Sequence, residues 1–184
     1  MIVVGILGAD GAAVPEIARR AAATGARTEV VGAAPIGAAG DRLLLQLTTA
    51  GVGHATVTRG TTSAEPPIEP ADLDLALRYL PDVRAIVLVA PAAALLATAA
   101  AAAGFGGATL VVVGPLDPAD VDALGTPLPI VLDPPASDPD GAFAGLVAAL
   151  AARLDAGEEA AAAWRATLAD LTIEPTQPVD AART

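Results

Sequence analysis

The chain alternates short, β-branched apolar runs with longer Ala-rich stretches over most of its length. The runs that fit strands are residues 2–7, 28–31, 55–58, 85–89, 109–113 and 130–132. The stretches that fit helices are residues 14–23, 41–50, 70–79, 92–103, 118–124, 142–154 and 158–168. Strands that read as continuous apolar runs and alternate with helices are typical of a parallel sheet covered on both faces. The pattern therefore predicts an α/β fold with a mostly parallel sheet of six strands.

The length of 184 residues fits one domain with a core of useful size. We expect this domain to span residues 1–172. The tail at residues 173–184 contains Pro and Thr without an apolar rhythm, and we expect it to be flexible. Residues 61–70 are rich in Pro and Glu, which predicts an exposed loop.

Composition and charge exclude several classes of function. The net charge is −11, and no basic stripe is present that could neutralise the phosphates of a nucleic acid. All ten basic residues are Arg, so the chain has neither a Walker-type phosphate Lys nor a Schiff-base Lys. There is no Cys, and the solitary His54, which we expect to cap a loop or pack at a strand edge, cannot build an imidazole metal site. We expect no metal centre.

A membrane span must be weighed because residues 85–103 carry no charge. Pro91 divides this run into a β-rich half and an Ala-rich half, which favours a strand followed by a buried helix. The first ten residues lack the basic start of a signal peptide. These features predict a cytoplasmic protein with no membrane partner.

Two Gly-rich segments have the composition of phosphate loops. Gly5, Gly8 and Gly11 follow a predicted strand, but their spacing departs from the G-x-G-x-x-G of dinucleotide-binding folds. Glu29 lies at the distance along the chain from which a carboxylate contacts a ribose in those folds, so a dinucleotide site stays open. Residues 104–107 connect a helix to a strand, the reverse of a phosphate loop, and we interpret them as a flexible turn.

Three carboxylates precede the predicted helix at residues 142–154. Asp133, Asp138 and Asp140 have the chemistry of an oxygen-ligand cation site. The more common role for an Asp in this position is to cap the helix, because its carboxylate accepts hydrogen bonds from free N–H groups and meets the positive end of the helix dipole. We favour capping.

The segment that begins at Asp138 and runs to Gly145 resembles the G-A-G-D-A-F segment of the ribokinase (PfkB-type) sugar and nucleoside kinases. In that family the Asp is the catalytic base, and the Gly-rich turn binds phosphate at a helix N-terminus. Here the position of the base is occupied by Gly141, and the family's glycines are replaced by Asp138, Pro139 and Asp140. The resemblance implies a kinase scaffold whose catalytic centre is degenerate.

Earlier segments extend the resemblance. Residues 3–10 are similar to the family's first strand, whose closing Asp contacts substrate, but Gly11 follows directly and the family's lid of strands is absent. Gly40 and Asp41 match the last Gly-Asp pair of a substrate-binding motif. The resemblance implies substrate binding by Asp10, Gly11, Gly40 and Asp41, anion or nucleotide binding by Asp138, Gly141 and Ala142, and a displaced catalytic carboxylate at Asp140.

Three functional hypotheses stay open. The first is a catalytically degenerate ribokinase-like protein that binds a small ligand, such as a sugar or nucleoside, or acts in regulation or assembly. The second is an active carbohydrate or nucleoside kinase that uses ATP and Mg²⁺ with Asp140 or Asp138 as the base. The third is a dinucleotide-binding protein built on Gly5, Gly8 and Gly11. For all three, open α/β sheets predict a pocket at the carboxyl ends of the strands.

Apolar content predicts self-association. Hydrophobic residues make up 54% of the chain and charged residues only 17%. A small sheet keeps two edges, and the lid that would cover apolar surface is absent. Since exposed edges and apolar faces are commonly buried by association, we expect a homo-oligomer, most simply a two-fold dimer.

Overall fold

A computed structural model of the chain describes residues 1–7, 13–59, 68–80, 82–124 and 128–172. Its strands are β1 (Ile2–Ile6), β2 (Glu29–Ala34), β3 (Gly53–Arg59), β4 (Ala85–Val89), β5 (Thr109–Val113) and β6 (Ile130–Leu132). Its helices are α1 (Ala13–Ala23), α2 (Ala38–Thr49), α3 (Pro70–Tyr79), α4 (Ala93–Gly106), α5 (Pro118–Leu124), α6 (Ala142–Asp155) and α7 (Ala160–Thr172). Every strand and helix predicted from the sequence is present, so the α/β prediction is confirmed.

Within the described residues the strands form one sheet in the order β3-β2-β1-β4-β5-β6, and all neighbouring pairs are parallel. The chain builds outward from β1 in one direction and then, from β4, in the other. This order creates a switch point between β1 and β4, where consecutive connections leave toward opposite sides. In open α/β sheets a crevice for ligands forms outside the carboxyl ends of the strands at such a point.

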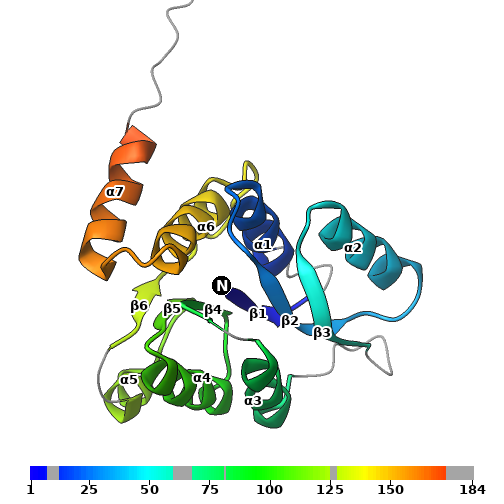
Figure 1. Cartoon of the computed structure of the whole chain (residues 1–184), viewed down its shortest axis with the longest axis horizontal. Helices are drawn as coiled ribbons and strands as arrows, with labels where there is room; N and C mark the ends of the chain where they lie inside the picture. Colours follow the sequence, from blue (N-terminus) through cyan, green and yellow to red (C-terminus); the bar gives the residue numbers. More distant parts are fainter. Residues whose placement is uncertain (8–12, 60–67, 81, 125–127, 173–184) are drawn as a thin grey trace, which may run out of the picture.

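Helices cover both faces of the sheet (Figure 1). One face is buried beneath α1, α2, α6 and α7, and its core contains Val3, Val87 and Val111 from the strands. The other face is buried beneath α3 and α4, with Leu124 of α5 packed at its margin. The fold is therefore a three-layer α/β/α sandwich, as the sequence predicts.

Residues 85–103 do not form a single helix. They divide into β4, which lies in the middle of the sheet, and α4, and no helix in the described part of the chain is long and apolar enough to cross a membrane. His54 lies in β3, an edge strand, where its Nδ1 is 3.2 Å from the Val52 carbonyl oxygen. Most of the predicted loop at 61–70 and all of the predicted tail at 173–184 lie outside the described residues.

The prediction for residues 104–107 is wrong. Helix α4 continues through Gly104, Phe105 and Gly106, and only Gly107 leaves it, with a left-handed φ of 69°. The N–H of Ala108 then bonds to the carbonyl of Ala103 at 3.0 Å, which closes the helix in the usual Gly-terminated manner. Any of these glycines permits such a turn, so composition alone does not place the helix end.

Candidate functional site

A crevice of about 420 Å³ opens at the carboxyl ends of β4 and β5. Its walls are the start of α1, residues 89–90 and 113–115 at the strand ends, residues 134–138 that follow β6, and the first turn of α6. Most of this lining is apolar, with Ile17, Phe143 and three prolines among its side chains. Its position beside the switch point agrees with the expected location of a pocket.

The backbone at two strand ends is bent into the crevice. Ala90, directly after β4, has a φ of 47°, which an L-residue rarely adopts, and Gly114, directly after β5, has a φ of 131°. The N–H of Ala90 bonds to the Val113 carbonyl at 2.8 Å, and the N–H of Gly114 bonds to the Leu132 carbonyl at 3.0 Å. Strained backbone of this kind persists where the surrounding structure enforces it, and it concentrates at binding sites.

A carboxylate occupies the N-terminus of α6. Phe143 donates its backbone N–H to Asp138 Oδ1 at 3.1 Å, and Ala144 donates its N–H to Asp138 Oδ2 at 3.0 Å. These groups belong to the first turn of the helix, whose N–H groups have no partner within the helix. Asp138 therefore fills the place where a helix N-terminus holds an external anion. The sequence-based preference for capping at Asp138 is confirmed.

The same contacts stabilise the charged form of this carboxylate. The hydrogen bond from the Ala144 N–H is the largest cause that lowers the pKa of Asp138 below its usual value of 3.8. The N–H groups of Phe143 and Ala142 and the charge of Arg20 lower this pKa further, while desolvation opposes them. Asp138 is thus a fixed anion at neutral pH, and it repels a second anion from the helix N-terminus.

An ion-pair chain ties α1 to the segment around Asp138. Glu16 accepts hydrogen bonds from Arg19 at 2.7 Å and from Arg20 at 2.6 Å. Arg20 also donates to the backbone carbonyl of Asp140 at 3.0 Å and lies against Gly141, where an added Cβ would collide with its guanidinium. Gly141 has a φ of 68°. Only glycine combines this backbone with this close approach.

The crevice contains some of the predicted site residues. Asp138 and Gly141 line it, and Ala142 begins α6 beside it. Asp140 is exposed and does not line the crevice; its backbone, not its carboxylate, makes the contact with Arg20. The arrangement therefore positions Asp138 as a cap and leaves Asp140 facing solvent.

The other predicted site residues lie elsewhere or outside the described residues. Gly40 and Asp41 are in the first turn of α2, beyond the carboxyl end of β2, and do not line the crevice. Helix α2 begins three residues earlier than predicted, after Gly37, whose φ is 84°. Asp10 and Gly11 lie outside the described residues.

The structure corrects the prediction that Glu29 could contact a ribose. It begins β2 and pairs with Ile2, so it lies at the amino end of the sheet, opposite the crevice. A ribose-binding carboxylate belongs at the carboxyl end of its strand. The proposed contact between Glu29 and a ribose is therefore wrong, although the strand order is one that dinucleotide-binding sheets also have. Gly8 and Gly11 lie outside the described residues.

Several residues of the site were not predicted from the sequence. Glu16 and Arg20 were not predicted as site residues, although their spacing of four residues is the signal for an ion pair on one helix face. Phe143 and Ala144 contribute through backbone N–H groups, which residue type does not reveal. In the described part of the chain, no three His, Asp or Glu side chains come together as metal ligands.

Comparison with known proteins places the fold. No family model matches the chain, and no curated protein matches its sequence. Among solved structures, the chain is similar to a candidate ribokinase II from E. coli (TM-score 0.63, 12% identity, 91% of this chain and 90% of that chain). It is also similar to that protein in complex with ATP and Mg²⁺ (TM-score 0.59, 10% identity, 90% of this chain and 89% of that chain). A third similar structure is a candidate phosphofructokinase from Staphylococcus aureus (TM-score 0.54, 14% identity, 92% of this chain and 90% of that chain).

The likeness shows the fold. The chain has a ribokinase-like three-layer α/β/α architecture. The fold implied by the sequence resemblance is confirmed, and the sequence identities of 10 to 14% carry no statement about activity.

Proposed function

We propose that the protein is a ribokinase-like sugar-kinase homologue that binds a small neutral ligand without phosphorylating it. The observation that best supports this proposal is the pair of hydrogen bonds that the backbone N–H groups of Phe143 and Ala144 donate to the carboxylate of Asp138. The resemblance assigns this turn to phosphate binding. In this chain its N–H groups already have an anionic partner that belongs to the protein.

Electrostatics supports the absence of phosphoryl transfer. Transfer from ATP requires cations or N–H donors that stabilise charge on the phosphates, and a base near the acceptor hydroxyl. The polar side chains at this end of the crevice are the carboxylates of Glu16 and Asp138 and the hydroxyl of Ser137. Glu16 is already paired with Arg19 and Arg20, so the fixed charge that disfavours a polyphosphate at the helix N-terminus is the carboxylate of Asp138, and Gly141 stands where the family has its base.

The same chemistry favours a polyhydroxy ligand. The oxygens of Glu16 and Asp138 retain lone pairs beyond those their partners use, and hydroxyl groups donate to such oxygens. Apolar walls from Phe143 and from the three prolines of the crevice suit the carbon face of a sugar or nucleoside. A neutral ligand meets no repulsion from the fixed charges. We therefore expect sugars and nucleosides to bind where ATP does not.

A thermal-shift panel of sugars, nucleosides and Mg·ATP, paired with an ADP-release assay on the same compounds, tests the proposal. A ligand at 100 times its Kd adds about 2.7 kcal/mol to the free energy of unfolding. We expect at least one neutral compound to raise Tm, no rise with Mg·ATP, and no substrate-dependent ADP. Ala136→Trp, which fills the crevice, should abolish the rise, whereas Ala169→Trp on the exposed side of α7 should keep it.

The competing kinase hypothesis predicts a different result. Substrate-dependent ADP release that disappears in Asp140→Asn would contradict the proposal and identify Asp140 as a displaced base. A rise in Tm that survives Ala136→Trp would place the ligand elsewhere and would also contradict the proposal.

A further inference from the structure

We infer that the crevice selects its ligand by the hydrogen-bond donors that the ligand carries, so that it binds a sugar or nucleoside with free hydroxyl groups and rejects the corresponding acid. This inference rests on the proposed function, because it concerns the same crevice, and it narrows the class of compound that the crevice accepts. It is based on the hydrogen bonds and the prolines at the ends of three neighbouring strands.

The chain leaves β4 and β5 without a free N–H group at either strand end. The N–H of Ala90, the first residue after β4, is donated to a carbonyl of β5 at 2.8 Å, and Pro91 follows. The N–H of Gly114, the first residue after β5, is donated to a carbonyl of β6 at 3.0 Å, and Pro115 follows. Since proline has no N–H, these four residues have no backbone donor left for a ligand.

The wall that continues from β6 to α6 has the same property. Residues 134–135, which line the crevice after β6, are both prolines. The N–H of Gly141 is donated to the Asp138 carbonyl at 3.1 Å, and those of Phe143 and Ala144 are donated to the Asp138 carboxylate. At each of these positions the N–H group is absent or already donated. Anion-binding turns of α/β folds instead present several free N–H groups.

The side chains of the crevice accept hydrogen bonds far more than they donate. Among the described residues that line it, Ser137 has the only side-chain donor, a hydroxyl that can also accept. The carboxylates of Glu16 and Asp138 are acceptors. The guanidinium of Arg20 does not line the crevice, and it donates to Glu16 and to the backbone carbonyl of Asp140. A ligand must therefore supply most of the donors itself.

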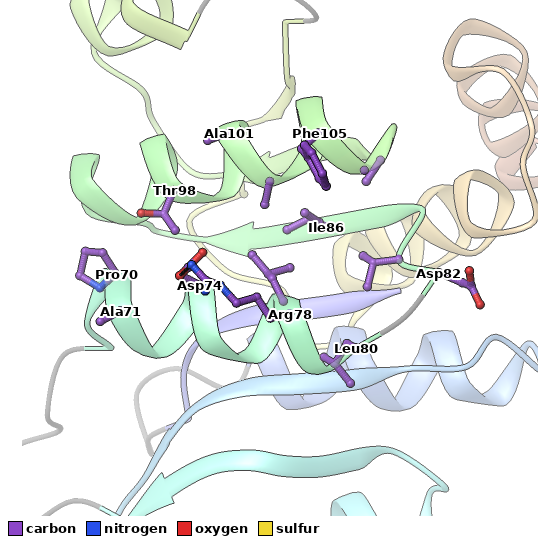
Figure 2. A pocket seen from close by; sticks show the side chains of 15 residues that line it. Pro70, Ala71, Asp74, Arg78, Leu80, Asp82, Ile86, Thr98, Ala101 and Phe105 are labelled. Carbon is purple, nitrogen blue, oxygen red and sulfur yellow. Dashed lines mark ion pairs between the residues drawn. The ribbon is translucent and has the colours of Figure 1, made fainter.

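A second cavity shows that this bias belongs to the crevice and not to every hollow of the surface. The groove between α3 and α4, of about 950 Å³, is lined by the carboxylates of Asp74 and Asp82 and by the guanidinium of Arg78 (Figure 2). Arg78 pairs with Asp74 at 2.7 Å, and its side chain is exposed, so N–H groups beyond those in this pair stay open to other partners. The groove therefore offers charged donors, and the described lining of the crevice does not.

Oxidation of a ligand hydroxyl to a carboxylate should weaken binding for two reasons. The carboxylate has acceptor oxygens only, so it finds few donors to replace those of water, and an acceptor without a partner opposes binding. Its charge also meets the carboxylate of Asp138. The hydroxyl that it replaces would donate to the acceptors of the crevice. We expect a rise in Kd of about tenfold or more.

Titration calorimetry with matched compounds tests the inference. The parent probes are glucose, galactose, ribose and adenosine, and each is compared with the analogue whose primary hydroxyl is oxidised to a carboxylate. A second series replaces one hydroxyl at a time by fluorine, which removes a donor and adds no charge. For a parent that binds, the acid and at least one fluorinated analogue should each raise Kd about tenfold or more.

Two isosteric variants locate the effect. Asp138→Asn and Asp140→Asn change the net charge equally, but only Asp138 lines the crevice. The ratio of the Kd of the acid to that of its parent should fall about tenfold in Asp138→Asn, because the amide adds a donor and removes the charge. It should stay unchanged in Asp140→Asn.

The outcomes separate the inference from the proposed function. An acid that binds as tightly as its parent, a fluorinated series with no weakened member, or an unchanged ratio in Asp138→Asn would overturn the inference and leave the proposed function standing. If no parent compound binds, the proposed function is wrong and the inference is overturned with it.

Discussion

A single carboxylate occupies the N-terminus of α6. Asp138 reaches the first turn of α6 with both oxygens, and Glu159 caps α7 in the same manner, accepting from Ala161 at 3.0 Å and Ala162 at 3.1 Å. The N–H of Ala161 is likewise the main cause that lowers the pKa of Glu159. Each cap therefore stabilises the fold in its ionised form.

Asp138→Asn should lower stability at pH 7 and lose that effect in acid. Asparagine offers one acceptor oxygen and no charge, so we expect the urea midpoint at pH 7 to fall by a few tenths of a molar. The pKa of Asp138 is depressed in the folded state, so its contribution is complete above 3.8 and disappears as the pH falls through the folded value. Urea unfolding at pH 7 and near pH 3 measures both.

Glu159→Gln is the matched comparison. The pKa of Glu159 is also lowered in the folded state, from an ordinary value of 4.5, so this cap should likewise lose its stabilising effect as the pH falls. A difference between Asp138→Asn and wild type that is equal at both pH values would show that the cap does not act through its charge. Equal stability at pH 7 would show that the two hydrogen bonds contribute nothing.

At the scale of elements, the contact between α1 and the start of α6 depends on Gly141. The glycine has a left-handed φ of 68° and lies against the guanidinium of Arg20. Gly25 has a comparable φ of 89° with no atom within 4 Å of an added Cβ. A substitution at Gly25 therefore tests backbone strain alone, whereas one at Gly141 tests strain together with a steric collision.

We expect Gly25→Ala to cost about 1 kcal/mol, the strain of a left-handed alanine. Gly141→Ala should cost about 1 kcal/mol more, because Arg20 must leave its place beside Asp140. Combining Arg20→Ala with Gly141→Ala should remove the excess relative to Arg20→Ala alone. Chemical denaturation of the four variants measures these differences, and equal losses for the two glycine variants would refute the role of Arg20.

The elements were predictable and their long-range contacts were not. Apolar runs and Ala-rich stretches located the strands and helices, and an Asp before an apolar helix predicted the cap at Asp138. Arg20 and Asp140 are 120 positions apart, and only the packing of α1 against α6 brings them together. The prediction for Glu29 was wrong because distance along the chain does not fix position in the sheet. Its distance from the Gly-rich segment suggested a ribose contact, but the register of β2 places Glu29 at the amino end of the sheet.

At the scale of the whole molecule, the crevice lies between α1 and α6 at the carboxyl ends of the strands, while α3 and α4 cover the opposite face of the sheet. We propose that Asp138 occupies the helix N-terminus at which the resemblance to the kinases would place a phosphate.

A ¹⁵N–¹H correlation titration with Mg·ATP tests that claim most directly, because it observes the two amides themselves. The Phe143 and Ala144 signals should stay in place at millimolar Mg·ATP, since both N–H groups are donated to Asp138. In Asp138→Ala, which frees them, inorganic phosphate should move both signals. If Mg·ATP shifts these two amides in the wild-type protein, the helix N-terminus accepts an external phosphate and the account is wrong.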